Sequence, residues 1–327
     1  MLLNESALPV AETLVGEAAA LGASVHVRGG VRVVDCGVQA PGCDAAGLLM
    51  ARAAMADRGR VELLAPDRAA FQDIWPACPW PVVAVASDEP VVACLAAQYA
   101  GWKVSDDGYF AMASGPLRAA IGREDLFDHV GHREAAPCAV GLLEASLLPP
   151  EKVCRSLANE AGVPPDRLIL LVARTASIAG TLQVVARSLE TALHKLHDLH
   201  FDLGRIRRGR GRAPLPPVPG KDIVAIGRTN DAILYGGHVQ LEVTGDDATL
   251  HGIGPRMVSR ASPEYGASFL ELFEKAGRDF YALDPALFAP AVVDLVNIDT
   301  GTTMRFGDLA PDIVRGSFTT PAEGAAR

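Results

Sequence analysis

The chain has 327 residues, 49% of them hydrophobic, which is enough for one large core or two ordinary ones. Its net charge of −9 argues against general affinity for nucleic acid, since such affinity needs a basic surface. No apolar run reaches the roughly 18 residues of a membrane span, the N-terminus lacks the pattern of a signal peptide, and the six cysteines form no Cys-x-x-Cys pair. We therefore expect a soluble cytoplasmic protein with reduced thiols and no membrane partner.

Predicted helices and strands alternate through the first half of the chain. Residues 4–21 place apolar side chains on one helical face, and residues 25–34 alternate around Gly29-Gly30 as in a β-hairpin. Beyond them we expect helices over 42–55, 90–98 and 149–162, and strands over 61–64, 82–85, 109–113, 138–143 and 168–173.

A single longer helix is predicted over 175–196. Its apolar stripe consists of Leu182, Val185, Ala186, Leu189, Leu193 and Leu196. A second stripe beside it consists of Gln183, Arg187, Glu190 and His194. An arginine and a glutamate one turn apart are either an ordinary surface ion pair or two polar groups that face a cleft. The pattern alone favours the surface ion pair.

The second half opens with an unusual basic segment. Residues 205–220 carry five arginines within eight residues, followed by a run rich in proline, which predicts a long connector without regular structure. Its arginines either balance nearby acids in solvent or hold an anionic ligand. Helix and strands are expected at 223–226, 232–235 and 239–243, then a helix over 269–274 and a strand over 292–298. Together these elements predict an α/β fold with mixed sheets.

Several short motifs suggest chemistry that the rest of the chain does not support. Asp299-Thr-Gly resembles the tripeptide of aspartic proteases, but that chemistry needs two such aspartates, so a turn is predicted. His194, His197 and His200 drift around a helix and cannot converge easily, so we expect no metal site. Nucleophile-elbow, dinucleotide and P-loop motifs are missing. Three small, polar, glycine-flanked segments are either ligand contacts or plain turns: Ser114-Gly115-Pro116, Thr175-Ala-Ser177 and Thr229-Asn230-Asp231.

An ordered set of longer segments closely resembles methenyltetrahydromethanopterin cyclohydrolases. The match runs in register from about residue 30 to residue 302. It is carried by Asp35-Cys-Gly-Val, Gly47-Leu-Leu, Ala100-Gly-Trp, Tyr109-Phe-Ala-Met-Ala-Ser-Gly-Pro116, Thr175-Ala-Ser-Ile-Ala-Gly180, Glu190-Thr-Ala-Leu-His-Lys-Leu196, Gly211-Arg-Ala-Pro, Gly227-Arg-Thr-Asn-Asp-Ala-Ile-Leu-Tyr-Gly-Gly237 and Asp284-Pro-Ala-Leu-Phe-Ala-Pro290.

The resemblance implies a two-domain, mixed-sheet α/β fold with a large inter-domain cleft. We place an N-terminal domain at 1–147 and a C-terminal domain with the catalytic helix at 148–327, with the chain free to cross between them. The family also implies a homo-oligomer, with a trimer favoured, and a role in one-carbon metabolism, in methanogenesis or in bacterial formaldehyde oxidation. The abundance of Ala, Arg, Gly and Pro is more like that of a bacterial member.

The reaction implied by the family is the reversible hydrolysis of 5,10-methenyl-tetrahydromethanopterin to N5-formyl-tetrahydromethanopterin, with the pterin as substrate and no cofactor. The family's catalytic Arg and Glu, three residues apart, map onto Arg187 and Glu190. Glu190 would take the proton of a water molecule and later return it to the opening C–N bond, and Arg187 would hold and tune the carboxylate. Burial disfavours a charged carboxylate there, and the guanidinium favours it.

Further residues match family positions and are candidates for pterin contacts: Ser114, Gly115, Thr175, Ser177, Thr229, Asn230 and Asp231. Two residues depart from the archaeal pattern, since Arg174 stands in place of a proline and Tyr99 in place of a lysine. Three rival functions stay open. They are a catalytically idle pterin-binding or assembly protein, a cyclohydrolase acting on a folate, and an RNA-binding protein that uses Arg205–Arg212.

Overall fold

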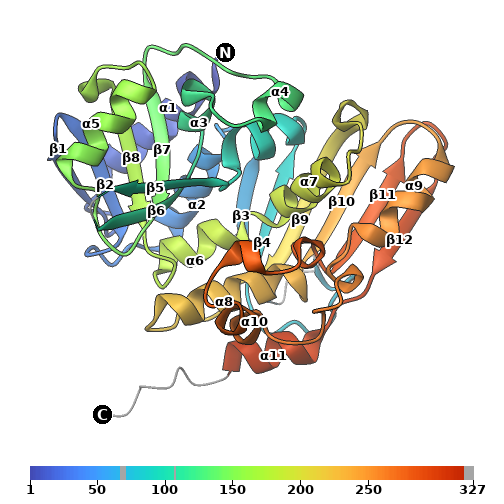
Figure 1. Ribbon diagram of the computed structural model, residues 1–327. Helices are drawn as coiled ribbons and strands as arrows, with labels where there is room; N and C mark the ends of the chain where they lie inside the picture. Colours follow the sequence, from blue (N-terminus) through green and yellow to red (C-terminus); the bar gives the residue numbers. More distant parts are fainter. Residues whose placement is uncertain (67–70, 107, 320–327) are drawn as a thin grey trace. The chain divides into compact units, whose positions relative to one another are not determined.

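A computed structural model gives the structure of residues 1–66, 71–106 and 108–319 (Figure 1). The chain divides into two compact units, Met1–Val61 with Val91–Val184 and Glu62–Pro90 with Val185–Arg327. Each unit is built on one six-stranded mixed sheet, which confirms the predicted mixed-sheet α/β class. The division differs from the predicted boundary after residue 147, because the strand at 168–173 pairs with strands of the first unit.

The first unit contains a sheet in the order β1-β2-β8-β7-β6-β5. Its elements are α1 (Leu3–Gly16), β1 (Ser24–Arg28), β2 (Val31–Gly37), α2 (Asp44–Ala54), π-helix η2 (Val91–Gln98), β5 (Trp102–Asp106), β6 (Tyr109–Ser114), α3 (Leu117–Ile121), α4 (Leu126–Val130), β7 (Ala139–Glu144), α5 (Glu151–Glu160), η3 (Pro165–Arg167), β8 (Leu168–Ala173) and α6 (Ile178–Val185). The predicted hairpin is confirmed: Arg28 faces Val31 across a turn in which Gly29 and Gly30 have φ of 61° and 91°.

Helices cover both faces of this sheet, and its central strands are therefore buried. All six residues of β8 are buried, as expected for a strand that is parallel to both of its neighbours and covered on each side. One core contains side chains of α5 with Val31, Leu143 and Leu170. The other contains side chains of α1 and α2 with Val34 and Leu171. The parallel strands β2, β8 and β7 end at one edge, where Ala173 pairs with Gly37 and with Glu144.

The second unit contains a sheet in the order β12-β11-β10-β9-β4-β3. Its elements are β3 (Arg60–Leu64), β4 (Val82–Ser87), α7 (Ser188–Asp198), η4 (Leu203–Arg205), β9 (Ile206–Pro214), α8 (Asp222–Leu234), β10 (His238–Val243), α9 (Asp247–Ile253), η5 (Gly254–Arg256), η6 (Ser259–Ala261), α10 (Phe269–Lys275), η7 (Phe280–Ala282), η8 (Pro285–Leu287), β11 (Val292–Asn297), β12 (Thr303–Gly307) and α11 (Pro311–Thr319). Asp299-Thr-Gly301 is a turn between β11 and β12, as predicted.

The arginine-rich part of the segment is the strand β9, so the predicted connector over 205–220 is wrong there, and only residues 215–220 form neither helix nor strand. β9 lies inside the sheet between β4 and β10 and is antiparallel to both. Its glycines and arginines alternate with the two-residue period of a strand: Gly209 and Gly211 are buried, whereas Arg208 and Arg210 are exposed. Glycine and proline content indicated a loop, and this period-two pattern was the stronger signal.

Helix α7 explains why β9 needs glycine. A Cβ atom at Gly209 would lie 2.6 Å from Cδ1 of Leu189, and one at Gly211 would lie 2.5 Å from Oγ of Ser188. The first turn of α7 therefore packs directly on the strand backbone, as seen where α7 crosses β9 in Figure 1. Two arginines of the strand are paired with acids, Arg208 with Asp88 at 3.1 Å and Arg212 with Asp73 at 3.0 Å.

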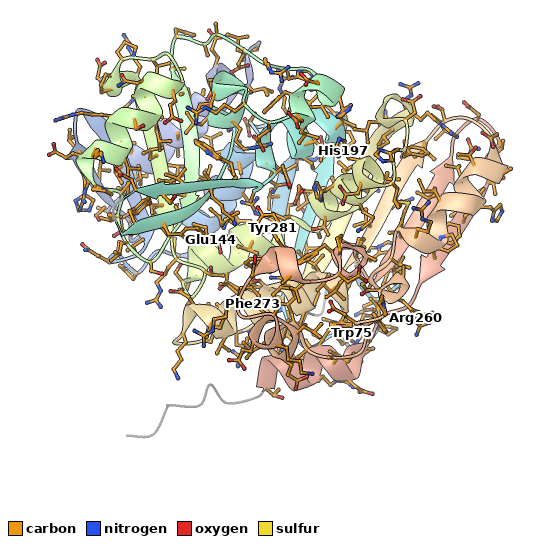
Figure 2. The ribbon with its side chains drawn as sticks, in the orientation of Figure 1. Trp75, Glu144, His197, Arg260, Phe273 and Tyr281 are labelled. Carbon is orange, nitrogen blue, oxygen red and sulfur yellow. The ribbon has the colours of Figure 1, made fainter. Side chains whose placement is uncertain are left out.

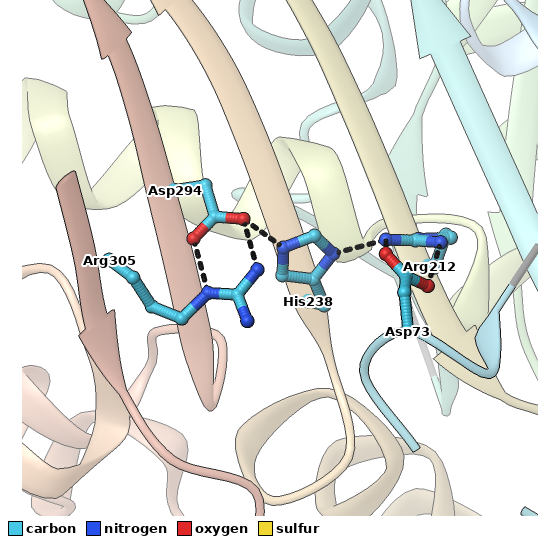
Figure 3. Close-up of polar contacts among 5 residues, drawn as sticks. All are labelled: Asp73, Arg212, His238, Asp294 and Arg305. Atoms are coloured by element: carbon cyan, nitrogen blue, oxygen red, sulfur yellow. Dashed lines mark hydrogen bonds and ion pairs between the residues drawn. The ribbon is translucent and has the colours of Figure 1, made fainter. Parts of the chain in front are cut away.

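Figure 3 shows a chain of polar and charged side chains that crosses this sheet. Arg212 forms an ion pair with Asp73 at 3.0 Å and donates through Nη2 to Nδ1 of His238 at 2.9 Å. Because an arginine can only donate, Nε2 of His238 carries the ring proton and donates to Asp294. Burial alone would raise the pKa of Asp294, but hydrogen bonds from Arg305 and His238 outweigh it and hold this pKa far below its ordinary value. The network links the four strands β9, β10, β11 and β12 to one another and to the segment around Asp73.

One further sequence expectation is wrong. The strand expected near residues 232–235 is absent, because the single helix α8 runs through that segment to Leu234. Within the described parts of the chain, no helix is long and apolar enough to cross a membrane.

Candidate active site

The helix predicted over 175–196 is two helices. α6 ends at Val185 and α7 begins at Ser188, with Ala186 and Arg187 forming a turn between them. Arg187 caps the start of α7 with φ −88° and ψ 7°, and its carbonyl accepts hydrogen bonds from the N–H and hydroxyl of Thr191. The apolar period continues across the break because both helices bury the same stripe, so periodicity could not reveal the turn.

Burial separates Arg187 and Glu190 from ordinary surface residues. The predicted apolar stripe is completely buried, and Arg187 and Glu190 each keep only 7% of their surface exposed. Charged side chains are rarely buried to this extent unless they are paired or have a function. The simple interpretation as a solvated surface ion pair does not fit this environment. His194, the last member of the predicted polar stripe, is only partly buried.

A positive and a negative side chain lie close together in sequence at the start of α7. Glu190 lies in that turn, where the unbonded N–H groups and the helix dipole favour a negative charge. Arg187, which is always charged, precedes it by three residues. Burial acts in the opposite direction and disfavours the carboxylate form. The site therefore combines a carboxyl group under opposing influences with a fixed positive charge, the ingredients of general acid–base chemistry.

Two contacts within the second unit hold α7 in place. Its first turn packs on Gly209 and Gly211 of β9, as described above. Further along, the buried Lys195 donates through Nζ to the carbonyl of Pro285. Burial lowers the pKa of Lys195, and the neighbouring Asp198 and Asp284 partly oppose that shift. The helix that carries Glu190 is thus fixed both to the sheet and to the segment beginning at Asp284.

Thr175 and Ser177 lie at the edge where the parallel strands of the first sheet end. Thr175 donates its hydroxyl proton to Oε1 of Glu144. Glu144, labelled in Figure 2, is the last residue of β7. Ser177 donates to the carbonyl of Arg174 at 2.8 Å and accepts from the N–H of Gly180 at 3.0 Å, which caps the start of α6. In open α/β sheets this edge is the usual place for a ligand.

Ser114 and Gly115 lie at a different level of the same sheet. Because β6 is antiparallel to β7, Ser114 faces Leu142, two residues before the end of β7 at Glu144. Gly115 has a φ of 89°, and its N–H donates to the carbonyl of Ala97 at 2.9 Å. The structure therefore does not bring Ser114 and Gly115 to the level of Thr175.

Thr229, Asn230 and Asp231 occupy the middle of α8 in the second unit. Thr229 and Asp231 have no exposed surface. The hydroxyl of Thr229 donates to the carbonyl of Ala225 at 2.9 Å, and Oδ1 of Asp231 accepts from the N–H of Phe269 at 2.8 Å. Asn230 is partly buried and donates to the carbonyl of Ile226. Asp231 therefore joins α8 to the start of α10 through its hydrogen bond with Phe269.

Asp231 leads to a prediction about stability and pH. Burial raises its pKa to about 7, against the lowering effect of hydrogen bonds from Ser317 and the Phe269 N–H. Between about pH 4 and pH 7 the unfolded chain therefore ionises this acid while the folded chain does not. As the pH rises through that window, the contribution of Asp231 to the free energy of unfolding should fall, by up to roughly 4 kcal/mol.

The variant Asp231→Asn should lose this part of the pH dependence. Urea unfolding of both proteins at several pH values between 4 and 8 measures the difference. Parallel stability curves would contradict the assignment of a buried, neutral acid at this position.

Glu144 directly follows the predicted strand 138–143 and was not among the predicted site residues. Tyr99 had no predicted role. The Tyr99 ring lies 5.0 Å from the guanidinium of Arg118, a fully buried side chain that donates to the carbonyls of Leu95 and Ala97. An apolar strand followed by an acid at its end was the available signal for Glu144. No signal in the sequence identified Arg118: the two carbonyls it contacts lie 23 and 21 residues away, and its ion pair with Glu124 at 2.8 Å, six residues away, follows no helical or strand period.

Comparison with known proteins places the chain in a family of enzymes. It belongs to the family whose model is described as Cyclohydrolase (MCH), which matches residues 2–318. The methenyltetrahydromethanopterin cyclohydrolase of Methylobacterium sp. (strain 4-46) is 44% identical over 322 residues, 97% of each chain. The enzyme of the same name from Rhodopirellula baltica is 42% identical over 97% of this chain and 94% of its own. The one from Methanosarcina barkeri is 37% identical over 90% of each.

Proposed function

We propose that the chain catalyses the reversible hydrolysis of 5,10-methenyl-tetrahydromethanopterin to N5-formyl-tetrahydromethanopterin. Membership of the cyclohydrolase family supports the reaction. The observation that supports the site is the burial of an arginine that caps a helix and of a glutamate in the first turn of that helix, which is fixed from two sides. A carboxyl group buried beside the start of a helix is suited to exchange protons with a bound water.

The carbon that reacts is already electrophilic. It lies between two nitrogens in an amidinium-like cation, so a water molecule can attack it once a base accepts the water's proton. We propose Glu190 as that base. The new C–O bond gives a neutral tetrahedral adduct, and protonated Glu190 then returns its proton to N10 as the C–N10 bond breaks. Loss of the adduct's hydroxyl proton to solvent leaves the N5-formyl group. One water is consumed and one proton is released.

Arg187 is proposed to control Glu190 rather than to react. Its fixed positive charge favours the carboxylate and offsets the cost of burial, so that the base is ionised when water binds. Because the substrate cation supplies the electrophile, the proposed mechanism requires no resident metal or organic cofactor. Thr175 and Ser177 are proposed substrate contacts of the first unit, together with Ser114 and Gly115. For Thr229, Asn230 and Asp231 we propose an indirect role through the packing of α8.

We further propose that the protein works in the cytoplasm as a homo-oligomer, with a trimer favoured. The six cysteines, all of which lie within the described residues, are free thiols, as expected in a reducing compartment. The oligomeric state can be measured by analytical ultracentrifugation.

One spectrophotometric experiment tests the reaction and the substrate together. The purified chain is mixed with methenyl-tetrahydromethanopterin and, separately, with methenyl-tetrahydrofolate, and the absorbance of the methenyl group is followed. We expect enzyme-dependent loss of absorbance with the methanopterin and far slower loss with the folate. Binding of the methanopterin without loss of absorbance would instead indicate an idle pterin-binding protein. Faster turnover of the folate would overturn the substrate.

A further inference from the structure

Glu144 is the carboxylate best placed to receive a ligand at the carboxyl edge of the first sheet. It ends β7, one strand away from β2 and beside β8, and it is only partly buried. The other acid near this edge, Asp35, is fully buried, and its two oxygens accept the N–H groups of Gly37 through Ala40. Asp35 is therefore occupied by its own loop, and Glu144 is not.

The carboxylate of Glu144 is held in one orientation but retains capacity to accept. Oε1 accepts the hydroxyl proton of Thr175, and among the described residues Oε2 accepts no hydrogen bond. Each carboxylate oxygen has two lone pairs, so both oxygens can accept a further donor without losing Thr175. Thr175 is itself fixed, because its carbonyl accepts the hydroxyl of Thr181 at 2.8 Å. Such a tethered carboxylate is preorganised for a ligand with two adjacent donors.

The substrate of the proposed reaction offers such a pair of donors. The pyrimidine ring of a pterin carries an N3–H group next to a 2-amino group, and together they match the two oxygens of a carboxylate in the way that a guanidinium does. We propose that Glu144 determines specificity for the pterin by accepting hydrogen bonds from this 2-amino-4-oxo edge. This inference rests on the proposed function only in taking a pterin as the ligand.

The proposal also gives Thr175 a definite part. Its only hydroxyl proton is donated to Glu144, so Thr175 orients the carboxylate and does not donate to the ligand. Thr175→Val removes that tether and leaves the charge in place. It should therefore weaken pterin binding less than Glu144→Gln, which replaces one acceptor by an N–H donor that opposes the pterin's own donors.

The test compares two probes and several variants by calorimetry. The probes are tetrahydropterin and tetrahydrolumazine, which has a 2-oxo group in place of the 2-amino group. We expect the wild type to bind tetrahydropterin about tenfold or more tightly than tetrahydrolumazine. Glu144→Gln should bring this ratio to one or below, because an amide can donate to a 2-oxo group. Glu12→Gln, which changes an exposed glutamate of the same unit, should keep the wild-type ratio.

Steady-state kinetics with the methenyl substrate complete the test. Glu144→Gln should raise KM about tenfold or more and change kcat far less, since the pterin edge does not react. A wild-type probe ratio in Glu144→Gln, or failure of the wild type to distinguish the two probes, overturns the proposal. Turnover by the wild type together with such a result would leave the proposed reaction standing and reject Glu144 alone. Binding with the expected ratio but no turnover would reject the reaction and leave Glu144 in place.

Discussion

Replacing Glu190 by glutamine should reduce kcat for the hydrolysis of methenyl-tetrahydromethanopterin by about 10²- to 10⁴-fold, the usual contribution of general acid–base catalysis. Glutamine has nearly the same shape as glutamate and can occupy the same place in the first turn of α7, but it cannot accept a proton from water. Steady-state rates measured over a range of pH should show a flat, strongly reduced profile.

A matched control separates loss of the base from loss of a charge. Glu274→Gln makes the same chemical change at an exposed position on α10 in the same unit. It should leave kcat and KM unchanged. Circular dichroism and thermal unfolding of both variants check that the fold is kept. Normal turnover by a folded Glu190→Gln protein would refute the role of Glu190 as the base.

Replacing Gly211 by valine should both destabilise the second unit and impair catalysis. The added Cβ atom alone would lie 2.5 Å from Oγ of Ser188 and 2.7 Å from the backbone nitrogen of Leu189. A backbone atom in a packed helix cannot move aside cheaply, so the start of α7 must shift together with Arg187 and Glu190. We expect a loss of about 3 kcal/mol in the free energy of unfolding, the upper part of the range for overpacked cores, and a fall in kcat.

The control for this prediction is Gly220→Val. Gly220 is exposed, and a Cβ atom added there would meet no other atom within 4 Å. Denaturant unfolding and activity of that variant should match the wild type. Equal stability of the Gly211 and Gly220 variants would show that α7 does not depend on close contact with β9.

Local patterns in the sequence predicted most elements of this fold, and long-range contacts account for what they missed. The strand at 168–173 was recognised because a short, wholly apolar run is typical of a parallel strand covered on both faces. The strand β9 was missed because its glycines accommodate α7, which folds back onto the strand, and no local pattern shows this packing even though α7 closely precedes β9 in the chain. Proline and glycine content was then given more weight than the alternation of glycine and arginine.

The candidate site was predictable to a similar degree. Their spacing alone predicted that Arg187 and Glu190 lie on the same stripe of a helix, and the resemblance to a family implied their catalytic role. Neither revealed that Arg187 sits in a turn between two helices, because the buried stripe continues unbroken through it. Glu144 escaped notice because its partner, Thr175, is 31 residues away in the sequence. Tertiary contacts of this kind leave no periodic trace.

The most direct test of the account is a single-turnover experiment with enzyme in excess over methenyl-tetrahydromethanopterin. Rapid mixing with the wild type should abolish the methenyl absorbance in one fast phase. The Glu190→Gln protein should bind the substrate, as shown by calorimetry, while the absorbance persists for at least about a hundred times longer. Loss of absorbance at the wild-type rate in that variant would contradict the assignment of Glu190 as the group that activates water.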